Sequence, residues 1–220
     1  MFLSKKLLNF VPDVVLLDTS TPGSYTTYMI PGVYRITLAA GGGAGASCYY
    51  SRTGRSGPGA KGGCGGTVQV DIALPQACTA SVTIGEKPYS THVNMANTGD
   101  SARGEDGANI SITGIPNLTI SCDGGTGGYL VAGRNGVNAT ATPGVQGGVS
   151  VSGSSIIRVN VNSNNTPVTS TTGVGTVGQL NTNWPEPFTT AMCPGSGGAS
   201  GTRSYQVLAS GGGVKIRRMA

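Results

Sequence analysis

The sequence predicts an all-β fold in which antiparallel strands form a β-sandwich-like core with little helix. Short runs such as residues 33–38 alternate apolar and polar side chains with a period of two, which is typical of half-buried strands. Glycine, proline and asparagine separate these runs, as residues that form turns do. Beyond residue 18 no segment carries apolar side chains at helical spacing.

The predicted strands follow one another at short intervals along the chain. The first two, at 25–30 and 33–38, are bounded by Pro-Gly pairs at 22–23 and 31–32. The later strands carry β-branched residues at alternate positions, and they are expected at 67–72, 80–84, 109–112, 118–121, 157–161, 205–208 and 214–217.

Residues 1–18 are predicted to be an N-terminal apolar segment, and residues 19–220 the glycine-rich β domain. We expect the segment to serve assembly by docking onto a partner or onto the main domain. Asn9, Pro12 and Asp13 interrupt its apolar run and no small-x-small cleavage site follows, so we find no recognisable signal peptide. The residues expected to mediate assembly are Leu7, Leu8, Phe10, Val14, Val15 and Leu16.

The composition excludes several classes of protein. Of the 220 residues 38 are glycine, and only 10% are charged, whereas an average domain has roughly 7% glycine and about 25% charged residues. The glycines keep no strict period of three, so the chain is not collagen. No apolar run reaches about 18 residues, so we expect no membrane-spanning helix. The net charge of +5 is scattered along the chain rather than clustered, so we expect no nucleic-acid partner.

Glycine gathers in regions at 41–66 and 124–153, and in a broken third region over 173–213. These regions are either flexible linkers or ordered helices of the polyproline II type, with three residues per turn. In the ordered form, neighbouring helices would satisfy each other's backbone N–H and C=O groups. We favour the ordered form because these regions lie within the strand framework and also contain alanine, cysteine, valine and tyrosine.

Five motifs follow one another in a recognisable order: TPGSYTTYMIPGVYRITL (21–38), GGGAG (41–45), GGCGG (62–66) before a strand, ASVTIG (80–85) and GGGVKI (211–216). This order resembles the glycine-rich domain of bacteriophage tail-fibre and adhesin-like proteins. The chain departs from that pattern at Glu86-Lys87-Pro88, which replaces further glycines, and over residues 173–192; residues 1–18 lie outside it.

This resemblance implies a non-enzymatic structural or receptor-binding fibre protein, often trimeric, in a virion or outside a cell. It implies contact with copies of the same chain and with a host surface receptor or glycan. The composition is also similar to tip adhesins of T-even-like phages, which pack polyglycine II helices and bind receptors through the joining loops. The alternative is a self-assembling extracellular filament or matrix subunit that polymerises by exchange of its N-terminal segment.

Aromatic residues in loops are the predicted binding residues, because rigid aromatic side chains anchor interfaces and contact saccharides. Tyr49, Tyr50 and Arg52 lie between two glycine runs, and Trp184 and Phe188 flank a proline-rich turn. For Trp184 and Phe188 a second interpretation stays open, in which they fill a small core or a subunit contact.

We predict no catalytic residue, cofactor or metal site. A Ser-His-Asp triad would need His92, the sole histidine, which we expect in an exposed loop without a special partner. Glu105 and Asp106 are adjacent and are expected in a solvated turn, where they suit acid–base chemistry poorly. The cysteines are too far apart for a zinc knuckle. We favour free thiols at Cys48, Cys64, Cys78, Cys122 and Cys193, and one or two disulfides stay open as the alternative for a protein outside a cell.

Overall fold

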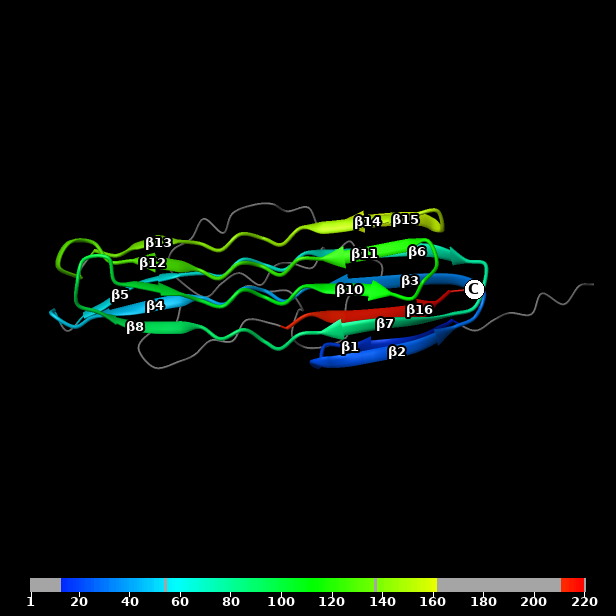
Figure 1. The fold of residues 1–220 in the computed structure, drawn as a ribbon, viewed down its shortest axis with the longest axis horizontal. Coiled ribbons are helices and arrows are strands. Elements are labelled where there is room, and N and C mark those ends of the chain that lie inside the picture. Colours follow the sequence, from blue (N-terminus) through cyan, green and yellow to red (C-terminus); the bar gives the residue numbers. More distant parts are fainter. Residues whose placement is uncertain (1–12, 54, 137, 162–210, 220) are drawn as a thin grey trace, which may run out of the picture.

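The computed structural model describes residues 13–53, 55–136, 138–161 and 211–219. The molecule is a rod, with strands at both ends and extended chain between them (Figure 1). Its described part contains strands and a single short 3₁₀ turn, Arg134–Gly136. The predicted all-β fold is confirmed.

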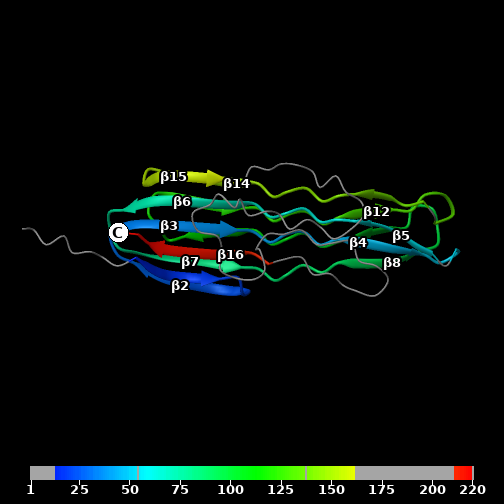
Figure 2. The ribbon, with the colours of Figure 1, turned by 180° about the vertical axis from the view of Figure 1, so that it is seen from behind.

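Two antiparallel five-stranded sheets form the larger end of the rod, which we call the sandwich (Figures 1 and 2). The first sheet has the order β1 (Val14–Thr19), β16 (Gly213–Arg218), β3 (Gly32–Ala39), β6 (Thr67–Leu74) and β15 (Ile156–Val161). The second has the order β14 (Val149–Gly153), β11 (Leu118–Cys122), β10 (Ile110–Thr113), β7 (Cys78–Ile84) and β2 (Gly23–Met29).

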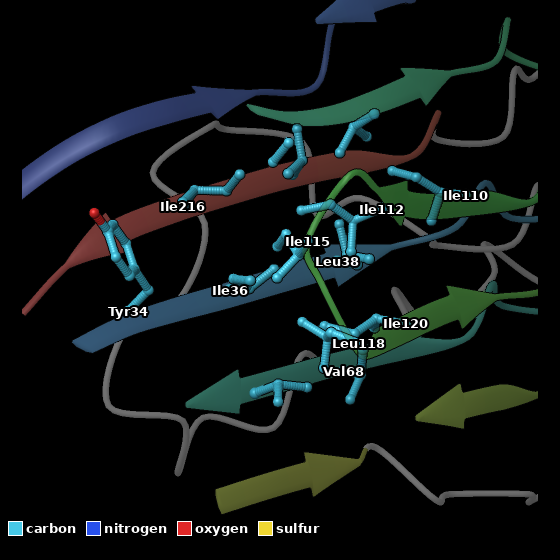
Figure 3. Packing of buried hydrophobic residues seen from close by; sticks show 14 of the residues in the cluster. Tyr34, Ile36, Leu38, Val68, Ile110, Ile112, Ile115, Leu118, Ile120 and Ile216 are labelled. Carbon is cyan, nitrogen blue, oxygen red and sulfur yellow. The ribbon is translucent and has the colours of Figure 1, made fainter. Parts of the chain in front are cut away.

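The core of the sandwich forms where the apolar faces of the two sheets meet (Figure 3). Ile36 and Leu38 of the first sheet lie against a group that includes Ile112 and Ile120 of the second, and all four are almost fully buried. The strands predicted from alternating residues are present, with ends that differ by at most two residues. The strand predicted at 205–208 lies outside the described residues.

Three excursions, which we call arms, leave the sandwich and return to it: residues 40–66, 85–109 and 123–148. Each arm runs out as extended chain, contains two strands at the far end and runs back (Figure 1). The far strands are β4 (Ala46–Tyr50), β5 (Arg55–Ala60), β8 (Thr91–Met95), β9 (Ser101–Arg103), β12 (Tyr129–Val131) and β13 (Thr140–Thr142).

The far strands form two three-stranded sheets, β5-β4-β8 and β13-β12-β9. β4 and β8 pair in parallel, because they belong to different arms that run outward side by side. Cys48, Met95 and Leu130 belong to a small apolar cluster between these sheets, and each is at most 2% exposed. Each end of the rod therefore has an apolar core of its own.

The middle of the rod is a bundle of glycine segments, at 40–45, 60–66, 104–109, 123–128 and 143–148, joined by backbone hydrogen bonds of 2.7–2.9 Å. Residues three apart in one segment bond to the same neighbour. Segment 40–45 shows the pattern with three neighbours. Toward segment 60–66, Ala40 N donates to Gly66 O and Gly43 N donates to Gly63 O; toward segment 104–109, Gly41 N donates to Ala108 O and Ala44 N donates to Glu105 O. From segment 123–128, Gly125 N donates to Gly41 O and Gly128 N donates to Ala44 O.

A period of three with hydrogen bonds to several neighbours is the pattern of packed polyglycine II-type helices, which have three residues per turn. A β-strand, with a period of two, bonds to two neighbours on opposite sides. The described glycine segments therefore match the ordered form that we favoured over flexible linkers.

The close approach of the segments explains why glycine is needed there. A Cβ atom added to Gly43 would overlap the carbonyl oxygen of Thr126, and one added to Gly63 would overlap that of Val145. A Cβ on Gly125 would overlap the carbonyl oxygen of Gly63. Backbone atoms cannot move aside without breaking the hydrogen bonds of their own segment, so a side chain has no room at these three glycines.

At the outside of the bundle, side chains replace missing backbone partners. Asp106 Oδ1 accepts a hydrogen bond from Gly127 N, and Asn109 Oδ1 accepts one from Gly124 N, each at 2.7 Å. The two acceptors are three residues apart in one segment, and so are the two donors in the next. The side chains thus continue the period of the backbone bonds.

We expect Gly125→Ala to destabilise the protein by at least about 2 kcal/mol, because the new methyl group meets a backbone carbonyl that cannot yield. Urea unfolding measured by circular dichroism tests this. The matched control is Gly148→Ala, whose Cβ would meet only the flexible carboxylate of Asp123, at 3.0 Å, and which should cost less than about 1 kcal/mol. Equal losses of stability in the two variants would contradict the steric explanation.

Candidate functional site

Three turns, one from each arm, meet at the far end of the rod, and we call residues 51–53, 96–100, 132–136 and 138–139 the tip. The other end of the rod holds the ends of the described chain, since Val14 at the start of β1 pairs with Arg218 at the end of β16. Figure 2 shows the C-terminus at the end opposite to β4, β5, β8 and β12. The tip is thus the part of the rod furthest from both described ends.

The first two arms are joined directly at the tip. Ser51 N and Ser51 Oγ both donate hydrogen bonds to the carbonyl oxygen of Met95, each at 3.1 Å. The serine hydroxyl therefore fixes the turn after β4 against the end of β8.

The second and third arms are joined by three hydrogen bonds. Gly99 N donates to Ala132 O at 3.1 Å, and Ala132 N donates to Asp100 O at 2.7 Å. Asn135 N donates to Thr98 Oγ1 at 3.0 Å. These bonds hold the turn after β12 on the turn after β8.

Tyr50 joins the third arm to the first. Its hydroxyl accepts a hydrogen bond of 2.9 Å from Ala139 N, and its ring lies over Gly57, where a Cβ would come within 3.0 Å of the ring. The side chain is half-buried and packs against the small apolar cluster that includes Leu130. The three turns therefore form a closed ring of contacts, which gives the tip a defined shape.

Asp100 organises the turn of the second arm. Its Oδ2 accepts hydrogen bonds from Ala96 N and Asn97 N, both at 2.7 Å. These two bonds stabilise the carboxylate and lower the pKa of Asp100 from the ordinary value of 3.8, and the bond from Asn97 N contributes more than the bond from Ala96 N. The acid is therefore charged at neutral pH and is already engaged by its own turn.

The tip presents hydrogen-bond donors to solvent. Arg52 and Arg134 are exposed on the turns of the first and third arms, and Asn97, Thr98 and Asn138 are exposed beside them. Guanidinium groups bind carboxylates and phosphates, and amides bind hydroxyl groups. The surface is suited to polar or anionic groups rather than to an apolar ligand.

The predicted binding residues fall into separate places. Arg52 is exposed at the tip, Tyr49 is half-buried within β4, and Tyr50 holds arms together. Trp184 and Phe188 lie outside the described residues. The sequence reasoning missed Arg134, although the following Asn135-Gly136 pair is a turn signal that could have indicated an exposed loop.

We expected His92 in a loop, but it lies in β8. Its Nδ1 atom lies 2.9 Å from Ser47 Oγ of the parallel neighbour β4. This is a cross-strand contact between an exposed histidine and a buried serine, since residues 47 and 92 are partners in the register.

We expected Glu105 and Asp106 in a turn, but they lie in the glycine segment 104–109. Glu105 Oε2 accepts a hydrogen bond of 2.8 Å from Tyr89 N, and Asp106 forms an ion pair of 2.9 Å with Arg103. Both carboxylates therefore hold neighbouring chain in place.

The described cysteines, Cys48, Cys64, Cys78 and Cys122, are free thiols, and Cys193 lies outside the described residues. Burial raises the pKa of Cys122 to about 12, so this thiol is protonated and unreactive. Within the described ranges no cluster of three or more His, Cys, Asp or Glu side chains could hold a metal ion. In the described part of the chain, no helix is long and apolar enough to cross a membrane.

The residues expected to mediate assembly lie partly in the sandwich. Val14, Val15 and Leu16 belong to β1, which pairs with β16 of the same chain. Val14 and Val15 are 41% and 50% exposed, while Leu16 packs against the core. Leu7, Leu8 and Phe10 lie outside the described residues, so their role stays a prediction.

The sequence was compared with models of protein families and with curated proteins, and neither comparison gives a match.

We expect Asp100→Ala to loosen the tip, because Ala96 N and Asn97 N lose their acceptor. Hydrogen–deuterium exchange at these two amides should become roughly tenfold faster, while Asn94→Ala, an exposed change in β8, should leave them unaffected. Since folding lowers the pKa of Asp100, protection in the unmodified protein should persist above pH 3.8 and disappear only as the pH falls below that value. Unchanged exchange in Asp100→Ala would contradict the role of this carboxylate.

Proposed function

We propose that this protein is a non-enzymatic structural and receptor-binding fibre protein of a virus particle, similar to bacteriophage tail fibres or tip adhesins. It would assemble as a homo-oligomer and bind a host surface receptor or glycan through the turns of its tip. The observation that supports this most directly is the placement of three interlocked turns at one end of a rod, with both described ends of the chain at the other.

The construction of the rod suits the presentation of a contact surface at a distance. The glycine bundle is held by backbone hydrogen bonds in several directions, so the arms support one another along their length. The tip turns are held in one arrangement, so binding would cost little additional ordering of the chain. A fibre would connect through the sandwich end and leave the tip exposed.

Assembly as a homo-oligomer is supported by one long side of the rod. β14 and β15 are edge strands of the two sheets, and both lie on the side of the molecule where segment 143–148 runs (Figure 1). Exposed apolar side chains there include Ile157 (60% exposed), Val159 (40%) and Val145 (67%). Copies that covered this side would bury apolar surface and close sheet edges, and several tips would then bind together.

For the tip we predict that Arg52→Ala combined with Arg134→Ala weakens binding of the fluorescently labelled protein to a panel of bacterial cells by at least about fivefold. Both guanidinium groups are exposed, so the loss would reflect contact and not folding. Flow cytometry measures the binding, and circular dichroism checks the fold.

The matched control is Arg103→Ala, which removes an exposed arginine from β9, outside the tip and away from the side with β14 and β15, and which should leave cell binding unchanged. If the double variant binds every strain as well as the unmodified protein does, the tip does not carry receptor binding through these residues.

The alternative, a self-assembling extracellular filament or matrix subunit, is supported by the place of β1. This strand is at the edge of its sheet, pairs only with β16 among the described strands and lies next to the start of the described chain. Exchange of β1 between copies would join them in an open series.

The two functions predict different particles in negative-stain electron microscopy. Filaments that persist in a variant lacking residues 1–12 but disappear when residues 1–19 are removed would support exchange of β1. Short discrete particles in the full-length protein would favour the fibre and contradict the filament.

A further inference from the structure

One face of the sandwich is built almost entirely of hydroxyl groups. In the sheet formed by β14, β11, β10, β7 and β2, buried apolar residues alternate with outward residues, and none of these strands contains a charged residue. Apart from Tyr28, whose phenol is also a hydroxyl, the outward residues that carry hydroxyls are Ser24, Thr26, Thr79, Ser81, Thr83, Ser111, Thr113, Thr119, Ser121, Ser150 and Ser152.

The register of the strands sets these hydroxyls in two rows across the sheet. Neighbouring strands lie about 4.8 Å apart, so paired residues bring their hydroxyls close together, as in the 3.1 Å contact between Ser24 Oγ and Thr83 Oγ1. The observed pairs are Ser24–Thr83, Ser111–Ser121 and Ser121–Ser150 in one row, and Thr26–Ser81, Ser81–Thr113 and Thr119–Ser152 in the other.

A shallow hollow of about 530 Å³ lies on this face where the sheet meets the glycine bundle. The hydroxyls that line it belong to Ser81 and Thr83 of β7, Ser111 and Thr113 of β10 and Ser121 of β11, and Asn109 and Asp123 stand at its bundle end. The hydroxyls of Ser111 and Ser121 form no hydrogen bond within the described part of the chain. The hollow is therefore of ligand size and lined with groups that can still bind.

Asn109 and Asp123 are held in place by the bundle. Asn109 Oδ1 accepts from Gly124 N, so the amide orientation is fixed and its NH₂ group is left as a donor. The backbone of Asp123 donates to Gly148 O and accepts from Gly66 N, each at 2.9 Å, and its side chain is exposed. The hollow therefore offers one amide donor and one carboxylate acceptor next to several neutral serine and threonine hydroxyls.

We propose that this hollow is a binding site for a neutral saccharide unit. A sugar ring presents hydroxyls that both donate and accept, which match the serine and threonine hydroxyls, the Asn109 amide and the Asp123 carboxylate. An apolar ligand would leave these polar groups without partners. None of the lining residues is a cation, and Asp123 repels anions, so phosphate and acidic sugars fit poorly.

The site lies on the sandwich, away from the tip, and its argument does not depend on the proposed function. An exposed site built on single hydrogen bonds to hydroxyls binds weakly, so the dissociation constant for one sugar unit is expected to be about 1 mM or higher.

The experiment is titration of the ¹⁵N-labelled full-length protein, followed by NMR, with glucose, galactose, mannose and N-acetylglucosamine. At least one of these sugars should shift amide signals at Ser111, Ser121 and Asp123. Glucuronate should bind more weakly than glucose, because its carboxylate meets that of Asp123.

Two variants test the contacts. Ser111→Ala combined with Ser121→Ala should weaken sugar binding at least fivefold, and Asp123→Asn should remove the preference for glucose over glucuronate. The matched control, Thr26→Ala combined with Ser152→Ala, removes hydroxyls from the same face outside the hollow and should bind as the unmodified protein does.

The proposal is overturned if none of the four sugars shifts signals at the hollow, if the shifts occur only at the tip, or if the serine variant binds as tightly as its control. These outcomes leave the cell-binding test of the tip unaffected, so the failure of one proposal is distinguishable from the failure of the other.

Discussion

The structure depends on one constraint, which is that every backbone N–H and C=O group inside the bundle must find a partner on a neighbouring segment. The segments satisfy it by turning once in three residues and lying so close that only a hydrogen atom fits at many Cα positions. Glycine is the one residue that meets both conditions. An unusual composition is therefore the direct result of how the middle of the rod holds together.

Backbone bonds alone do not fix which residues face each other. A shift of one segment by three residues would bring equivalent N–H and C=O groups back into register. The apolar clusters at the two ends prevent this shift, because Ile36 and Ile120 at one end and Met95 and Leu130 at the other must keep their partners. The few large apolar residues thus specify the alignment, and the glycines supply the cohesion between them.

The sequence predicted those parts of the fold that depend on side-chain burial. β3 and β6 alternate clearly because one face of each lies in the sandwich core, and the helical segments within the first two glycine regions have the order that we expected, while most of the third region lies outside the described residues. β5, with two glycines and a proline, and the three-residue β9 carry too few apolar residues to be recognised. At the tip, Arg52 could be predicted as exposed, whereas the role of Tyr50 follows from a bond to another arm that only the fold reveals.

The period of three also governs how the length of this rod can change during evolution. Each helix of this type rises about 3.1 Å per residue. Insertion of three residues into the outward and the returning stretch of every arm would move the tip outward by roughly 9 Å and leave each backbone group facing the same neighbour as before. An insertion of one or two residues would turn the rest of the segment toward the wrong neighbours. The reach of such a protein can therefore grow or shrink only in discrete steps, each set by one turn of the helix.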